Sequence, residues 1–441
     1  MRILYLLLKI TLNYSLRVFY PRLKFINSPK QFLGRTIYVS NHAASFMDPL
    51  IVAGFRMPIV FFMTRSDIFN KFTQPILWAS HMLPIYRQLD GDDTKGKNEA
   101  VFKKCSKILS AGRNLLIFGE GFTDDAFIRR LKPIKKGAVR IGFITLEELN
   151  WKKDIFIAAV GVNYSDPNQM RSDILMSYSD KIRLNDYREE YEKNPNKVIN
   201  ELTKEIELLL QLQLTHVNEK EHAPFHEQIM MINRKGMNAL NFDRKYSLKQ
   251  RWVCSRKLAK WLNEQNFEEN KELKMLEEES KSYFSLINRF KIQEQYMFWK
   301  ANNPEGSRTK ELIALTLLFP FAVIGAIHCA PAYLIVKRFV EKTMKRAVFW
   351  SSMKLILGKL LIAIVNIPLI FIFYYCIYQS WWLWIAYFFS IGLTGLAAYM
   401  WVLNFKRFKT KGVIRKMDTS KLLAKREALE AKINAVIPDF N

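Results

Sequence analysis

Three long apolar segments in the last third of the chain constrain its fold more than any other feature. Residues 312–336 carry no formal charge over 25 positions, residues 360–377 none over 18, and residues 381–405 none over 25. Each segment reaches the length that an α-helix needs to cross the hydrocarbon core of a bilayer. Only residues 378–380 separate the second segment from the third, so residues 360–405 are predicted to form a hairpin. The chain is therefore predicted to be a membrane protein.

Basic clusters lie on both sides of this hairpin and predict its orientation. They are Lys337, Arg338, Lys342, Lys345 and Arg346 before it, and Lys406, Arg407, Lys409, Lys411, Arg415 and Lys416 after it. The positive-inside rule places both clusters on the cytoplasmic side. A full crossing by residues 312–336 would then carry the N-terminal part of the chain to the opposite side. Because Pro320 and Pro331 interrupt this segment, we predict a re-entrant or broken helix there, within a membrane region over 311–405. The N-terminal part is then cytoplasmic, and residues 406–441 form a basic tail with a short helix.

The net charge predicts an anionic partner. The chain has 67 Lys and Arg against 41 Asp and Glu, which gives +26 over 441 residues. Such a balance favours either nucleic acid or an anionic lipid surface. We find no recognised nucleic-acid motif, and the basic clusters beside apolar segments favour the membrane. The four cysteines and six histidines show no metal-binding spacing, so neither a disulfide framework nor a metal site is predicted.

The N-terminal part divides into a helix and an α/β domain. Residues 1–30 predict an interfacial amphipathic helix, because their uncharged core is too short to span a bilayer, although an ordinary core helix is the alternative. Buried-strand patterns then alternate with helical ones, which predicts an α/β domain over 31–183 with a mostly parallel sheet flanked by helices. The strands are expected over 36–40, 58–65, 83–87, 114–121, 155–164 and 173–182, and the helices over 67–80, 95–111 and 136–149. Residues 184–310 predict a charged helical extension with no assigned function.

His42 and Asp48 follow the first predicted strand and form the first candidate site. Asp48-Pro49 is typical of a helix start, with Asp48 as the N-cap, and Ser45 and Asp48 fit a capping box. Residues six apart on a helix lie about 240° apart, so His42 and Asp48 can meet only if residues 43–47 form a loop. Asp48 would then fix the imidazole tautomer while the other nitrogen takes a proton from a hydroxyl. The residues alone leave both alternatives open.

A glycine-flanked carboxylate and a basic stretch form the second candidate site. Glu120 lies between Gly119 and Gly121 at the end of a predicted strand, where a ligand can approach the backbone. Arg87 ends another predicted strand and is a candidate phosphate ligand. Basic side chains beside the helix that begins at Gly137 are further candidates. They are Arg129, Arg130, Lys132, Lys135 and Lys136. A solvated charge is the alternative for each of them.

In their order these motifs resemble the glycerophospholipid acyltransferases, the superfamily that includes glycerol-3-phosphate and lysophosphatidate acyltransferases. The family pattern has four blocks: Asn-His followed by Asp, an Arg after a short strand, Phe-Pro-Glu-Gly, and a Val-Pro-Val strand. The matching segments here are Asn41, His42 and Asp48, then "LPIYR" ending at Arg87, then "FGEG" at 118–121, then "AAVGVNY" at 158–164. The resemblance covers about a third of the chain, over roughly residues 30–182.

The resemblance implies a reaction and a set of roles. His42 would be the general base, helped by Asp48, and would deprotonate an acceptor hydroxyl for attack on the thioester of acyl-CoA or acyl-carrier protein. It implies no acyl-enzyme, metal or cofactor other than this co-substrate. The predicted substrate-binding residues are Asn41, Arg87, Glu120, Gly121, Arg129, Arg130 and Lys135.

Three departures from the family pattern bear on the acceptor. Five residues separate His42 from Asp48, one more than usual, which resembles a subgroup of fungal glycerol-3-phosphate/dihydroxyacetone-phosphate acyltransferases and related bacterial proteins. Gly119 replaces the usual proline. Thr123 stands where many members have an arginine, which leaves Arg129, Arg130 or Lys135 as substitutes.

We therefore predict a membrane-bound O-acyltransferase that acylates glycerol-3-phosphate or 1-acyl-glycerol-3-phosphate in phospholipid biosynthesis. Its expected partners are acyl-CoA or acyl-carrier protein, a glycerol-phosphate or lysophospholipid acceptor and membrane lipids, without nucleic acid. Two alternatives stay open. One is an acyltransferase of the same fold that acts on another lysolipid, and the other is a non-catalytic basic membrane protein that binds anionic lipid.

Overall fold

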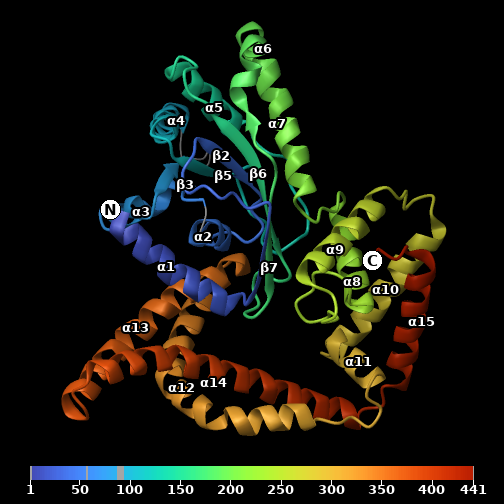
Figure 1. Cartoon of the computed structure of the whole chain (residues 1–441). Helices are drawn as coiled ribbons and strands as arrows, with labels where there is room; N and C mark the ends of the chain where they lie inside the picture. The colour runs from blue at the N-terminus through green and yellow to red at the C-terminus, as the bar shows by residue number, and fades with distance from the viewer. Residues whose placement is uncertain (1, 56–57, 87–93, 441) are drawn as a thin grey trace. The chain divides into compact units, whose positions relative to one another are not determined.

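Two compact units make up the chain in a computed structural model that describes residues 2–55, 58–86 and 94–440. The first unit comprises Met1–Met230, Arg234–Gln265 and Phe440–Asn441, and the second comprises Met231–Asn233 and Asn266–Asp439. Figure 1 traces their helices and strands. The helical extension predicted over 184–310 is divided between the two units. Arg87 lies outside the described residues, so the structure gives no account of that predicted phosphate ligand.

The first unit is built on an eight-stranded sheet in the order β1-β7-β6-β2-β5-β3-β4, with β8 paired to β6 (Figure 1). The strands are β1 (Arg22–Ile26), β2 (Thr36–Ser40), β3 (Val60–Arg65), β4 (Met82–Ile85), β5 (Asn114–Phe118), β6 (Phe156–Tyr164), β7 (Asp173–Tyr178) and β8 (Ile182–Arg183). Among the described strands, β7 and β8 run antiparallel to β6 and the other pairings are parallel. The predicted α/β class with a mostly parallel sheet is confirmed.

Helices cover the sheet and extend its core. They are α1 (Arg2–Phe19), α2 (Met47–Gly54), α3 (Gln74–Ala79), α4 (Thr94–Ser110), α5 (Gly137–Glu148), α6 (Arg188–Lys193), α7 (Pro195–Leu212), α8 (Ala223–Asn233) and α9 (Leu248–Asn263). One buried cluster joins Ile37 and Leu115 of the sheet to Leu109 of α4, Ile141 of α5 and Leu202 of α7. Residues after 184 therefore complete the α/β core, because α7 supplies part of the apolar cover that a parallel sheet requires.

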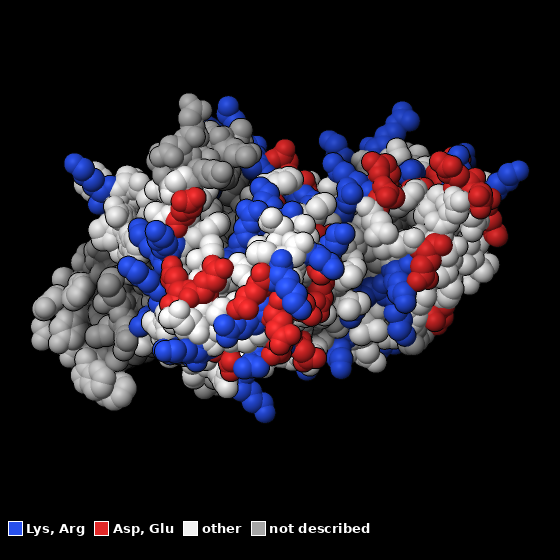
Figure 2. Space-filling view, turned by 90° about the horizontal axis from the view of Figure 1, so that it is seen from above, with Lys and Arg blue, Asp and Glu red and all other residues white. Residues whose placement is uncertain are grey.

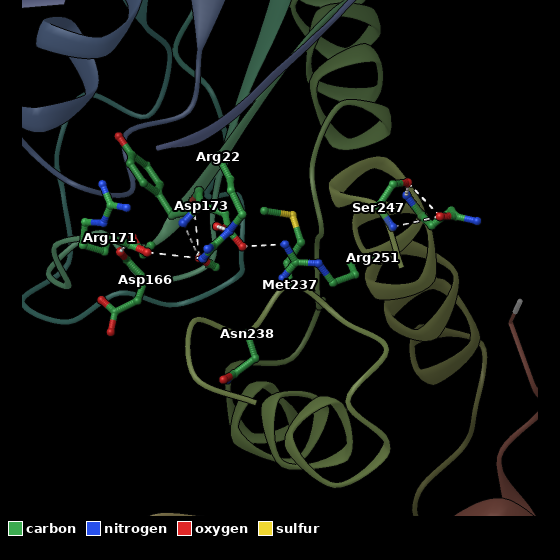
Figure 3. Close-up of polar contacts among 12 residues, drawn as sticks. Arg22, Asp166, Arg171, Asp173, Met237, Asn238, Ser247 and Arg251 are labelled. Atoms are coloured by element: carbon green, nitrogen blue, oxygen red, sulfur yellow. Dashed lines mark hydrogen bonds and ion pairs between the residues drawn. The ribbon is translucent and has the colours of Figure 1, made fainter. Parts of the chain in front are cut away.

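A buried ion-pair cluster fastens α9 to the edge of the sheet (Figure 3). The carboxylate of Asp173, at the start of β7, is fully buried and pairs with Arg22 of β1 and, at 2.6 Å, with Arg251 of α9. The Arg251 guanidinium also lies 4.1 Å from the centre of the Phe242 ring. A buried arginine is costly without a partner, so Asp173 is what allows α9 to pack here. This contact gives part of the extension a structural role that its sequence did not indicate.

The second unit is helical. Its helices are α10 (Lys271–Arg289), α11 (Glu294–Ala301), α12 (Thr309–Thr343), α13 (Trp350–Cys376), α14 (Trp381–Lys416) and α15 (Ser420–Val436). Three of its segments, Thr309–Thr343, Ala347–Cys376 and Trp381–Lys416, are long and apolar enough to cross a membrane. They indicate a membrane-associated protein.

A re-entrant or broken helix was predicted over residues 312–336. The break is not found, because α12 continues through both Pro320 and Pro331. A proline removes one backbone donor, and neighbouring helices can compensate for such a local loss. The neighbouring helix α14 packs closely along α12, and the indole nitrogen of Trp401 donates to the carbonyl of Leu315, five residues before Pro320, at 3.1 Å. Gly325 also approaches the backbone of Thr394 so closely that a Cβ would not fit. Glycine at the crossing is typical of membrane helix pairs.

A polar cluster connects the three membrane-length helices. His328 of α12 contacts the Asn366 side-chain oxygen of α13 through Nδ1 at 2.7 Å, and the Tyr387 hydroxyl of α14 through Nε2 at 3.2 Å. The Asn366 amide nitrogen donates to the carbonyl of His328 at 3.0 Å. Polar side chains in apolar helices are costly unless they pair, so this cluster satisfies groups that lipid could not.

Candidate active site

The carboxyl ends of β2, β5 and β6 meet at one edge of the sheet. Since β5 and β6 both run parallel to β2, the residues that follow the three strands are neighbours. The backbone nitrogen of Gly119 donates to the carbonyl of Ser40 at 3.0 Å. The Asn41 side chain is buried and its amide pairs with the backbone of Val162, accepting at 2.9 Å and donating at 3.1 Å. Asn41, predicted to bind substrate, thus joins β2 to β6.

His42 and Asp48 touch, as their predicted pairing requires. The Nδ1 atom of His42 lies 2.9 Å from Oδ2 of Asp48. A short loop makes this contact possible, with Ser45 in the left-handed region at a φ of 50°. The predicted N-cap role of Asp48 was wrong: α2 begins at Met47, and its N-cap Phe46 makes no side-chain capping bond. The Asp48 side chain turns back toward the loop because its carboxylate finds donors there.

Three donors surround the fully buried carboxylate of Asp48. Oδ2 accepts from the backbone nitrogen of Ala44 at 2.9 Å as well as facing His42, and Oδ1 accepts from the Tyr164 hydroxyl at 2.6 Å. A buried carboxylate is stable only when its oxygens are hydrogen-bonded. Burial and the charge of Asp48 raise the pKa of Tyr164 well above its usual value, so this hydroxyl remains a donor. The sequence did not reveal Tyr164, because it is one of several apolar or aromatic residues in a buried strand.

The His42 ring is held on one side and open on another. Phe118, the last residue of β5, stacks on it with ring centres 4.3 Å apart. The side chain is 21% exposed, whereas that of Asp48 is not exposed at all. Since Nδ1 faces Asp48, Nε2 is the nitrogen left to meet a substrate, and it makes no hydrogen bond to the residues described. A partly exposed imidazole with a buried carboxylate behind it is suited to general-base chemistry.

Glu120 supports the backbone of the site. Its Oε1 accepts from the backbone nitrogen of His42 at 2.6 Å, and its Oε2 accepts from the backbone nitrogen of Lys132 at 3.4 Å. Burial raises the pKa of Glu120, and the hydrogen bond from His42 opposes this rise. Both oxygens face protein donors, so Glu120 positions the loop that carries His42. The sequence had predicted it as a substrate acceptor.

Glycines flank Glu120 for steric reasons. A Cβ on Gly119 would lie 2.9 Å from Ile134 and 3.0 Å from Val39, while Gly121 has a φ of 76° that favours glycine. Gly119 therefore fits a crowded strand end.

The predicted basic ligands divide into a buried residue and exposed ones. The Arg129 guanidinium is buried and binds Glu227 at 2.9 Å and the carbonyl of Tyr164 at 2.7 Å, so it is committed to the protein. Arg130 is exposed. Lys135 is also exposed, and its ammonium nitrogen lies 3.0 Å from the position of a Cβ on Gly121. Lys135 thus lies beside the Glu120–Gly121 turn.

Lys132 is a further cation at this turn. Its ammonium lies 3.4 Å from Oε2 of Glu120 and 3.2 Å from Asp124. On the face in Figure 2, acidic and basic side chains lie side by side and form no uniform basic surface. Among the described residues, no group of three His, Cys, Asp or Glu side chains could hold a metal ion.

One comparison with known proteins finds the same class. The family model for acyltransferases matches residues 23–160. A search of curated proteins found no match. The matched region runs from β1 into β6 and contains the His42–Asp48 pair, Phe118 and Glu120. The first unit therefore carries an acyltransferase domain, and this match supports acyl transfer in lipid biosynthesis as its general activity.

Proposed function

We propose that the protein is a membrane-bound O-acyltransferase that transfers a fatty acyl group from acyl-CoA or acyl-carrier protein to glycerol-3-phosphate or 1-acyl-glycerol-3-phosphate. The observation that carries this proposal is the His42–Asp48 pair, 2.9 Å apart at the carboxyl edge of the sheet, with the imidazole partly exposed. Burying a carboxylate costs free energy of folding, and a histidine that only binds lipid headgroups does not need a buried carboxylate beside it. This cost favours catalysis over a non-catalytic lipid-binding role.

The proposed reaction uses His42 twice. Asp48 keeps the imidazole proton on Nδ1, so Nε2 takes the proton of the acceptor hydroxyl as its oxygen attacks the thioester carbonyl. A new ester bond forms, and the carbon–sulfur bond breaks. The imidazolium then returns the proton to the departing thiolate, which leaves as the free thiol. No acyl-enzyme and no metal take part in this scheme.

The acceptor phosphate is proposed to bind beside the Glu120–Gly121 turn. The Lys135 ammonium lies beside Gly121, and the Lys132 ammonium lies next to Glu120. Arg130 and Arg87 stay as further predicted ligands. Exposed lysines can bind a phosphate through the charge of their ammonium groups, without the paired hydrogen bonds that an arginine guanidinium would make. Thr123, which replaces the arginine of many acyltransferases, is the observation that keeps another lysolipid acceptor as the second candidate.

The membrane is the proposed source of the 1-acyl-glycerol-3-phosphate acceptor and the site where the acylated product is released. The outer face of α1 exposes Leu7 at 56% and Ile10 at 65%, while Tyr5 and Leu16 are buried. An apolar outer face suits a helix that lies in the membrane interface. We propose that the first unit works on the cytoplasmic face, with the three apolar helices as its anchor.

The test is an acceptor panel with the full-length protein in lipid nanodiscs. Radiolabelled acyl-CoA or acyl-carrier protein is supplied with glycerol-3-phosphate, dihydroxyacetone phosphate, 1-acyl-glycerol-3-phosphate or lysophosphatidylcholine. Labelled ester from glycerol-3-phosphate or its 1-acyl derivative supports the proposal. Labelled ester from lysophosphatidylcholine alone would favour the second candidate, an acyltransferase that acts on another lysolipid. The absence of labelled ester with every acceptor would refute acyl transfer to glycerolipids.

A further inference from the structure

We infer that Tyr164 is a positioning residue that fixes Asp48, and through it His42, and that Arg129 anchors the strand end that carries Tyr164. The catalytic part of this inference rests on the proposed function. The positioning itself rests on contacts alone and can be measured without any substrate.

The Tyr164 hydroxyl is the donor that orients the Asp48 carboxylate from its far side. It donates to Oδ1 at 2.6 Å, whereas the loop donors, His42 and the backbone of Ala44, both meet Oδ2. Both partners of the Tyr164 bond are fully buried. Without this hydroxyl, Oδ1 would lose the one hydrogen bond found for it among the described residues. The carboxylate would then be held from one side and could rotate away from the imidazole.

Arg129 fixes Tyr164 from behind. Its Nη1 donates to the carbonyl of Tyr164 at 2.7 Å and its Nη2 to the carbonyl of Ser165 at 3.3 Å, at the end of β6. Its Nε pairs with Glu227 at 2.9 Å, which orients the guanidinium. The Tyr164 ring also packs against that of Phe127, with centres 6.2 Å apart. A continuous row of contacts therefore runs from Glu227 through Arg129 and Tyr164 to the candidate catalytic pair.

Replacing Tyr164 by phenylalanine removes the hydroxyl and keeps the ring. The Asp48 carboxylate is then held from the Oδ2 side, by His42 and the backbone of Ala44, so it fixes the imidazole less firmly with Nε2 as the free base. We expect kcat to fall roughly tenfold with KM nearly unchanged, because a hydrogen bond to a charged group is lost at the reacting centre and not at the substrate.

Tyr178 provides a matched control in the same sheet. It lies in β7, is buried like Tyr164, and its hydroxyl has no hydrogen-bond partner among the described residues. Tyr178→Phe therefore removes the same atom from a similar environment without touching Asp48. It should leave the activity and the thermal stability close to those of the wild type.

The deciding experiment measures His42 directly. Full-length wild type, Tyr164→Phe and Tyr178→Phe are treated with diethyl pyrocarbonate at one fixed pH, and the rate of modification of the peptide containing His42 is quantified by mass spectrometry. The reagent reacts with the free imidazole nitrogen, so the rate reports whether Asp48 still holds the ring with Nε2 as the nucleophile. We expect the rate to fall several-fold in Tyr164→Phe, and to stay unchanged in Tyr178→Phe.

Equal modification rates for wild type and Tyr164→Phe would overturn the inference, as would an equal slowing in Tyr178→Phe. Arg129→Lys keeps the positive charge but loses the planar guanidinium that binds two carbonyls, and should slow the modification as Tyr164→Phe does. An inactive wild-type protein would refute the proposed function, while the modification rates would still decide the role of Tyr164.

Discussion

Asp48→Asn separates the charge of the carboxylate from its shape. In the structure Oδ2 faces two N–H donors, from His42 and Ala44, while Oδ1 faces the Tyr164 hydroxyl. A hydroxyl can accept as well as donate, whereas the two N–H groups cannot accept. The amide nitrogen therefore fits only beside Tyr164, and the amide oxygen takes the place of Oδ2. All three hydrogen bonds survive, so the variant should fold with His42 in its original tautomer.

What this variant loses is the charge that stabilises the imidazolium formed during the reaction. Two unit charges about 4 Å apart interact with about 4 kcal/mol at an effective dielectric constant of about 20. At about 1.4 kcal/mol per factor of ten, this loss corresponds to a kcat about 1,000-fold lower. The midpoint of thermal unfolding should change by only a few degrees, because no hydrogen bond is lost.

The assay is the initial rate of labelled ester formation, with thermal unfolding measured on the same preparation. Asp67→Asn is the control, because Asp67 is half-exposed and pairs with Arg65 at the surface; it should keep wild-type activity. A rate for Asp48→Asn within tenfold of the wild type, from a folded protein, would refute the argument that the buried charge assists His42.

Three further predictions concern stability and binding. Asp173→Asn should destabilise the first unit by about 3–5 kcal/mol in denaturant unfolding, because it leaves a buried arginine unpaired, whereas Asp243→Asn at the surface should change little. Gly325→Ala should lower the thermal midpoint in detergent by pushing α14 from α12, while Gly358→Ala should not, since its Cβ meets nothing within 4 Å. Lys135→Ala should raise the KM for a phosphorylated acceptor several-fold with kcat nearly unchanged. Equal stability of Asp173→Asn and Asp243→Asn would contradict the role of the buried ion pair. A Gly325→Ala variant with an unchanged thermal midpoint would contradict the close packing of α12 and α14, and an unchanged KM for Lys135→Ala would contradict phosphate binding by Lys135.

The sheet could be predicted from the sequence where strands are apolar along their whole length. β2, β5 and β6 read as strands because parallel strands covered on both faces are almost continuously apolar. β1 escaped prediction because "RLKFI" alternates charged with apolar residues beside an aromatic-rich helix. The course of α12 was mispredicted because proline positions alone do not reveal how closely a neighbouring helix packs.

The site could be predicted where its residues are close in sequence. His42 and Asp48 are six residues apart, and this spacing predicts that they can touch only if the residues between them form a loop. Tyr164 lies 116 residues beyond Asp48, and the partners of Arg129 lie on several other segments. Pairings of this kind depend on how the strands are ordered in the sheet, which a single sequence does not specify.

The most direct test of the central claim is the rate of ester formation by His42→Ala beside His222→Ala. His222 lies in a short helical turn outside the candidate site and controls for the loss of an imidazole. With acyl donor and the preferred acceptor saturating, His42→Ala should fold, insert into nanodiscs and lose at least about 1,000-fold in rate. His222→Ala should stay within about twofold of the wild type. Undiminished acyl transfer by a folded His42→Ala would contradict the assignment of His42 as the general base.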